Sequence, residues 1–117
     1  PEGSQYRWAA MLADEMENAP CIILTYSAAS GVAAASTFPG VQNLLLAARA
    51  LGIGSVLTTL HPEVMARVHE MFCIPDDLVF HCCIPLGYPR GNFGPTSRLP
   101  TSETTYWDKW GDAPPWK

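Results

Sequence analysis

The stretch from Pro39 to Ser55, PGVQNLLLAARALGIGS, decides the fold of this 117-residue chain. Its leucines and alanines make almost every side of a helix apolar over 38–51, which is typical of a core helix rather than a surface helix. Gly52 follows as a helix stop, because glycine accepts the left-handed backbone that ends many helices. The sequence therefore predicts one central helix, and the other elements must be arranged around it.

Helices and short strands alternate on both sides of this central helix. Residues 5–18 have apolar side chains at helical spacing, and Pro20 ends that helix because proline disfavours a helical residue before it. Residues 27–36, rich in Ala, Ser and Gly, are predicted to form a loop. Short apolar runs predict strands at 21–26, 55–59 and 78–86, the first of them buried on both faces.

A further helix is predicted to open at His61-Pro62-Glu63, with proline at its first position. The whole order predicts an α+β fold in which a small sheet packs with helices. The sheet has too few strands and too many open edges to be stable alone. The buried stripe of the further helix is predicted to consist of Val64, Met65, Val68, Met71 and Phe72.

The last thirty residues differ from the rest of the chain. From Pro85 onward lie six of the eleven prolines and three of the four tryptophans, without any periodicity. Such a segment is expected to lie as an extended arm on another surface, such as a second subunit. The sequence predicts one partial domain over 1–117, with a core over 1–87 and an arm over 88–117.

Composition excludes several classes of function. With 48% hydrophobic and 15% charged residues and a net charge of −4, the chain favours a folded protein that does not bind nucleic acid. No apolar run is long enough to span a membrane, and no signal peptide is recognisable, so a cytoplasmic location is expected. The cysteines are expected to be reduced and buried, at Cys21, Cys73, Cys82 and Cys83.

Common catalytic and metal-binding motifs are missing from the sequence. Gly52-Ile53-Gly54 has two glycines and follows a helix, so it does not match a dinucleotide fingerprint. The three histidines are not at ligand spacing with nearby acids, and no metal site is predicted. Chemistry centred on a bound organic cofactor stays open.

Several segments in a fixed order resemble the FMN-dependent nitroreductase family. They are the stretch from Pro39 to Ser55, then IPDD at 74–77, IPLGYP at 84–89 and GPTSRLP at 94–100. The resemblance, from about residue 13 to 111, implies an α+β homodimer that assembles through the core helix and the arm and binds FMN between its subunits. It also implies hydride transfer from NADH or NADPH, through flavin, to nitroaromatic or quinone-like acceptors.

The same resemblance assigns cofactor-binding residues. Thr58, Thr59 and Leu60 match the strand end at which the family presents backbone groups to the flavin ring. Arg98 matches an arginine that binds the phosphate, because a guanidinium can grip a phosphate with two hydrogen bonds. Where the family often has a second basic residue this chain has Thr96, and Arg90 is one possible source of the missing charge.

Plainer interpretations of these residues stay open. The two threonines fit a pleated strand without any ligand, and Arg98 fits a solvated tail. The family's N-terminal half also carries an R-x-S-x-R motif for the phosphate, whereas the only early arginine here is Arg7. The resemblance thus implies half of a cofactor site, through truncation or in a shortened natural form. A relative without tight flavin binding, acting as a homo-oligomeric interaction module, is the alternative function, and binding of another planar ligand is a third.

Overall fold

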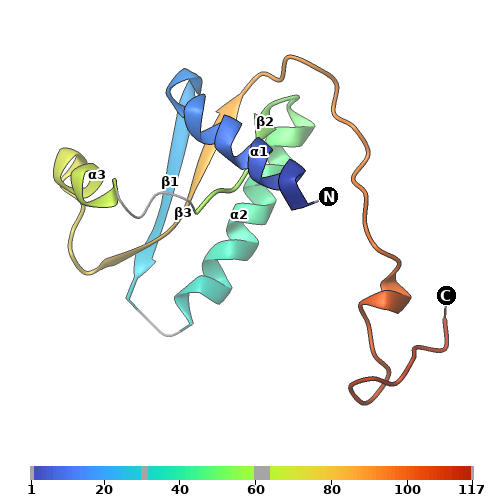
Figure 1. Cartoon of the computed structure of the whole chain (residues 1–117). Helices are drawn as coiled ribbons and strands as arrows, with labels where there is room; N and C mark the ends of the chain where they lie inside the picture. The colour runs from blue at the N-terminus through green and yellow to red at the C-terminus, as the bar shows by residue number, and fades with distance from the viewer. Residues whose placement is uncertain (1, 30–31, 60–63, 117) are drawn as a thin grey trace.

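The structure is a computed structural model that describes residues 2–29, 32–59 and 64–116. Figure 1 shows a body of helices and strands from which the C-terminal segment runs away. Among the described residues no helix combines the length and apolar character needed to cross a membrane. The elements are α1 (Glu2–Asp14), the 3-10 turn η1 (Met16–Asn18), β1 (Cys21–Ala28), α2 (Ala33–Ala50), β2 (Gly54–Ser55), α3 (Met65–Phe72), β3 (Leu78–Gly87) and the 3-10 turn η2 (Thr101–Glu103).

A three-stranded sheet with the order β1-β3-β2 lies at the centre of the body. Both neighbours run antiparallel to β3, and β1 pairs with it along its whole length, from Cys21 opposite Leu86 to Ala28 opposite Leu78. The register shifts between Thr25 and Tyr26, so no residue of β1 lies opposite His81 in the ladder. Such a bulge leaves one residue out of the ladder and bends the strand.

The helix α2 covers the sheet and completes the core. It contacts all three strands, and its Val41 packs with Cys82 and Ile84 of β3 in the buried cluster. Both β3 residues are 0% exposed, which makes the central strand the best-buried element described. The predicted central helix, the third strand and the α+β class are thus confirmed.

The side of α2 that faces away from the sheet is open, which corrects the prediction of a helix buried nearly all round. Leu46 is 57% exposed and Leu51 is 74% exposed. The reason is that a single layer, the sheet, packs on this helix within one copy of the chain. An apolar helix face without a cover is an expected contact surface.

The start of α2 also differs from the prediction. The helix begins at Ala33 and contains Pro39 in its interior, and β1 extends to Ala28, so most of the described part of the predicted 27–36 loop is regular structure. Three successive alanines favour a helix before Pro39, and the proline removes one backbone donor from it. The Thr37 hydroxyl donates to the Ala33 carbonyl at 2.9 Å within this first part.

Three further predictions about burial are wrong. No residue of β1 is fully buried, because α2 covers it on one side only. None of the α3 residues is buried, and Met71 and Phe72 are 68% and 61% exposed, since α3 makes few contacts with the sheet. All four cysteines are free, but only those of β3 are buried, whereas Cys21 and Cys73 are exposed at element ends. The predicted start of this helix at 61–63 lies outside the described residues.

Residues 88–116 contain no helix or strand apart from the η2 turn, and none of them is buried. Figure 1 shows this arm leaving the end of β3 and ending far from the sheet. The radius of gyration is 17.8 Å, against about 13 Å for a compact chain of this length. The arm's contacts in one copy are therefore mostly with itself.

Candidate functional site

The segment 54–59 is the part of the predicted site that the body holds in place. Gly54 and Ser55 pair with Gly87 and Leu86, and Thr58 then forms an isolated bridge with Cys83. In that bridge the Thr58 N–H donates to the Cys83 carbonyl and the Cys83 N–H to the Thr58 carbonyl, both at 2.9 Å. In place of the predicted strand over 55–59, the structure has the short strand β2, followed by the isolated bridge between Thr58 and Cys83.

Two glycines allow the chain to cross closely at this point. A Cβ on Gly54 would lie 3.2 Å from the Gly87 carbonyl oxygen, and a Cβ on Gly87 would lie 3.2 Å from Cδ of Pro20. Both distances are tighter than ordinary side-chain packing, so larger residues would push the segments apart. The chain therefore passes closely by itself where β2 pairs with β3.

The structure describes two of the three residues predicted to face a flavin ring, and both line one hollow. Thr58 is 8% exposed, and both of its backbone groups are engaged with Cys83. Thr59 is exposed and lines a hollow of about 360 Å³ between this segment and α1, next to Leu57 and Trp8. Leu60 lies outside the described residues. Thr58 and Thr59 thus both face this hollow, and Thr59 is the more exposed of the two.

Arg98 lies on the arm, away from the threonines. It is exposed, and its guanidinium donates to the carbonyl of the adjacent Ser97 at 3.2 Å. The arm is directed away from the sheet in Figure 1. Arg98 is not among the residues that line the hollow of Thr58 and Thr59.

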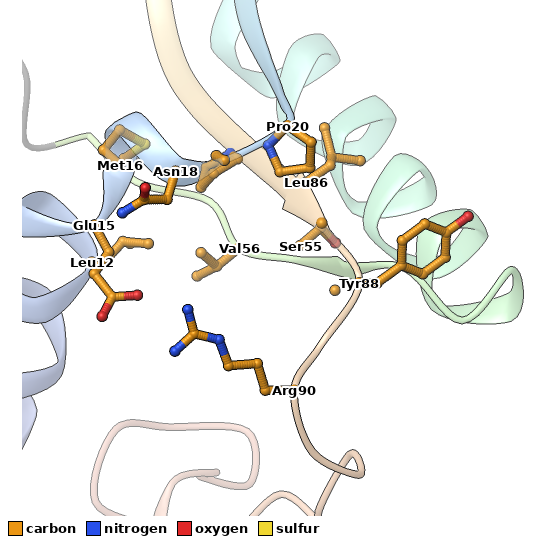
Figure 2. A pocket seen from close by; sticks show the side chains of 14 residues that line it. Leu12, Glu15, Met16, Asn18, Pro20, Ser55, Val56, Leu86, Tyr88 and Arg90 are labelled. Atoms are coloured by element: carbon orange, nitrogen blue, oxygen red, sulfur yellow. The ribbon is translucent and has the colours of Figure 1, made fainter.

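A hollow of about 610 Å³ lies where α1 and η1 face the ends of β2 and β3. Its floor is apolar and includes Leu12, Val56 and Leu86. Figure 2 shows the Arg90 guanidinium and the Glu15 carboxylate reaching into this space from different sides. Arg90 thus shares its hollow with an acid, which opposes its use for holding an anion.

A second hollow, of about 420 Å³, lies between the end of α2 and the first part of the arm. Its residues come from both segments and include Arg49, Ser55, Phe93 and Thr96. The guanidinium carbon of Arg49 lies 3.4 Å from the centre of the Phe93 ring, a cation–π contact. Sequence patterns gave no sign of this site, because a helix residue and an arm residue 44 positions apart form it.

Two groups of the sheet have a shifted pKa. Burial raises the pKa of the Tyr26 phenol. Burial, and then the neighbouring Cys82, raise the pKa of the Cys83 thiol. A buried thiol with a raised pKa is a poor nucleophile, because the thiolate is the reactive form. Among the described residues, no three His, Cys, Asp or Glu side chains gather where they could hold a metal ion.

Comparison with known families gives a match over most of the chain. The profile described as "Nitroreductase family" matches residues 1–88. Two curated relatives both have the name "Putative NADH dehydrogenase/NAD(P)H nitroreductase". The protein from Methanothermobacter thermautotrophicus is 38% identical over 71 residues, which are 59% of this chain and 37% of the relative. The protein from Archaeoglobus fulgidus is 45% identical over 51 residues, 42% of this chain and 29% of the relative.

Solved structures match the fold over a larger part of the chain. A protein of the same name from Bacteroides thetaiotaomicron VPI-5482 superposes with a TM-score of 0.66 at 25% identity, over 76% of this chain and 55% of that chain. An iodotyrosine deiodinase bound to FMN and 3-iodo-L-tyrosine superposes with a TM-score of 0.60 at 25% identity, over 80% of this chain and 55% of that chain. The chain thus spans about a third of the length of the curated relatives and about half of these structures.

Proposed function

Because the chain belongs to the nitroreductase family, as the match over residues 1–88 shows, we propose that it is part of an FMN-dependent oxidoreductase. In this proposal the bound flavin supplies the redox chemistry, taking hydride from NADH or NADPH and passing it to a nitroaromatic or quinone-like acceptor. The family match is the observation that carries the proposal. The choice of cofactor is supported by the iodotyrosine deiodinase of similar fold, whose structure contains bound FMN.

The chemistry of the residues present fits a flavin nucleotide. The hollow beside Thr59 has apolar walls from Trp8, Leu12 and Leu57, which suit a flat aromatic ring. Arg98 offers an exposed guanidinium, which suits a phosphate. In the proposal, the segment from Thr58 to Leu60 orients the ring, with Thr59 closest to it, and Arg98 holds the phosphate.

A second copy of the chain is part of the proposal, because the two groups of residues lie apart in one copy. We propose a homodimer through α2 and the arm. The uncovered face of α2 and the exposed aromatic side chains of the arm, with Trp110 at 88% exposure, supply apolar surface for such an interface. An arm that crosses to the partner would carry Arg98 away from its own body and toward the partner's.

One observation favours the alternative function. Arg98 does not line the hollow beside Thr59, and the sequence lacks the family's N-terminal phosphate motif, so this chain supplies half of a cofactor site. A homo-oligomeric interaction module with the same fold, and without tight flavin binding, would use the same apolar surfaces.

Titration of the purified chain with FMN separates the two functions. The enzyme proposal expects quenching of flavin fluorescence at micromolar FMN, and FMN-dependent oxidation of NADH or NADPH with a quinone as acceptor. No quenching at high micromolar FMN, with a dimer in sizing experiments, would select the interaction module. A compact monomer would contradict the proposed homodimer.

A further inference from the structure

The hollow between α1, η1 and the ends of β2 and β3 carries two opposite charges over an apolar floor. Its volume is about 610 Å³, within the range of roughly 300–1,000 Å³ that is typical of small-molecule sites. Glu15, between α1 and η1, lines it together with Arg90, from the segment that follows β3. Figure 2 shows that the carboxylate and the guanidinium both reach into the hollow. A ligand in this space therefore meets a negative group and a positive group together.

Both charges of this hollow are available to a ligand. In the described part of the chain, no hydrogen bond or ion pair engages the Glu15 carboxylate or the Arg90 guanidinium. Both residues are exposed, so each charge is hydrated until a ligand replaces the water. A ligand that pairs with both side chains would form charge-assisted hydrogen bonds, which are stronger than those between neutral groups.

The two charges select the class of ligand. Arg90 attracts an anion that Glu15 repels, and Glu15 attracts a cation that Arg90 repels, so a ligand with one charge gains little. A ligand with an ammonium group next to a carboxylate satisfies both side chains. The guanidinium can bind its carboxylate with two parallel hydrogen bonds, and the Glu15 carboxylate can accept from its ammonium group. We propose that this hollow binds an amino acid as a zwitterion, with its ammonium group at Glu15 and its carboxylate at Arg90.

The floor of the hollow selects the side chain of that amino acid. Leu12, Val56 and Leu86 line it. Val56 is 44% exposed although its side chain is aliphatic. An apolar side chain laid on this floor removes apolar surface of both partners from water, which favours binding. The amino acid that fits is therefore one with a large apolar or aromatic side chain.

One copy of the chain supplies both charged residues. Pro89, the neighbour of Arg90, lies beside β2, with its Cβ and Cδ atoms at 3.7 and 3.8 Å from the position of a Cβ added to Gly54. The Glu15 N–H donates to the Met11 carbonyl at 3.0 Å, which ties Glu15 to the end of α1. Arg90 thus belongs to the root of the arm, next to its own sheet. The site is compatible with the proposed homodimer, in which the later part of the arm crosses to the partner.

Four small molecules test the charges and the apolar floor separately. The purified chain, without flavin and in whatever oligomeric form it adopts, is titrated with L-phenylalanine, 3-phenylpropanoate, 2-phenylethylamine and glycine, and amide chemical shifts are followed. Saturable shifts are expected at Val56 and Leu86 with L-phenylalanine. The other three each lack the ammonium group, the carboxylate or the apolar side chain, so each should bind at least roughly tenfold more weakly. No saturable shift with L-phenylalanine, or equal binding of 3-phenylpropanoate, would overturn the site.

Variants of the two charged residues should give a crossed pattern. Arg90→Gln should weaken the binding of L-phenylalanine by at least roughly tenfold and strengthen that of 2-phenylethylamine, because a repelling charge is gone. Glu15→Gln should also weaken the binding of L-phenylalanine, and it should strengthen that of 3-phenylpropanoate. The matched controls are Arg67→Gln on α3 and Glu103→Gln in η2, both exposed and outside the hollow. They should leave the affinity for L-phenylalanine within about twofold.

A direct ion pair between the two side chains is the competing explanation. In that case Arg90→Gln and Glu15→Gln would each lower the free energy of unfolding and leave the affinity for L-phenylalanine unchanged, and the site is rejected. An equal loss of L-phenylalanine binding in the two control variants would also reject it, because the loss would then not depend on the charges of the hollow.

The amino-acid site is tested separately from the proposed oxidoreductase. Leu12 and Val56 line both this hollow and the one beside Thr59, so the two hollows are neighbours. Flavin binding is therefore measured on the same samples. A chain that binds L-phenylalanine and no flavin keeps the amino-acid site and loses the proposed function. A chain that binds FMN and no L-phenylalanine keeps the proposed function and loses the amino-acid site.

Discussion

The body of the chain and its arm are held by different kinds of interaction. In the body, β3 pairs with a strand on each side and buries Cys82 and Ile84 completely against α2. In residues 88–116 no side chain is buried, and two aromatic pairs, Tyr106 with Trp110 and Trp107 with Trp116, are the main side-chain contacts. The comparison teaches that the sheet and α2 make the buried core, to which the arm adds no buried side chain.

A cation–π contact joins the two regions. Arg49 of α2 stacks on Phe93 of the arm. A cation–π contact at an exposed site contributes about 0.5–1 kcal/mol, which is too little to hold thirty residues in one place. The arm is therefore expected to need a second surface, and each prediction below tests how far the two regions are independent.

The largest contrast is expected for apolar residues cut back to alanine. Ile84→Ala should lower the free energy of unfolding by about 2–5 kcal/mol, because it leaves a cavity under α2. Leu99→Ala in the arm, at a residue that is 67% exposed, should change it by less than about 0.5 kcal/mol. Urea denaturation followed by circular dichroism measures both. Equal losses would mean that the arm belongs to the same cooperative unit as the sheet.

The elements predicted correctly from the sequence are those of the body with a strong apolar pattern. The run from 78 to 86 and the leucines of α2 allow few other structures, because so much apolar surface must be buried. The start of α2 was missed because proline is common at the first position of a helix, whereas α2 already begins at Ala33 and contains Pro39 in its interior. The exposed stripe of α3 was missed because periodicity indicates an apolar face and does not say whether anything covers it.

The candidate site was predictable only where its residues lie close together in the sequence. The segment around Thr58 and the tail around Arg98 were both found from short motifs, and their roles stay predictions. Arg49 was missed because it has the ordinary appearance of a helix-end cation, and its contact with Phe93 depends on the route of the arm. Sites formed by distant segments leave no spacing pattern in one sequence.

An intermediate effect is expected at the point where the arm leaves the body. Gly54→Ala should lower the free energy of unfolding by about 1–3 kcal/mol, because its Cβ would press on the backbone oxygen of Gly87. Gly40→Ala is the matched control: nothing lies within 4 Å of its added Cβ, and alanine should stabilise α2 by about 1 kcal/mol. Thermal and urea denaturation measure the change in the free energy of unfolding, and thus its sign, for both variants. An unchanged free energy of unfolding for Gly54→Ala would show that the backbone around Gly54 and Gly87 accommodates the added methyl group at little cost.

The smallest effect on the body is expected from the most exposed aromatic residue of the arm. Trp110→Ser removes the ring pair with Tyr106, whose centroids are 4.4 Å apart, and should leave the unfolding of the sheet within about 0.5 kcal/mol. Such pairs contribute about 0.5–1.5 kcal/mol, so proteolysis within the arm should become roughly two- to tenfold faster. Limited proteolysis measures the rate of cleavage within the arm, at protein concentrations too low for two copies of the chain to associate. If the variant instead destabilises the body, and does so more at high protein concentration, the arm is part of an interface between two copies, and the independence of the two regions holds only for the isolated chain.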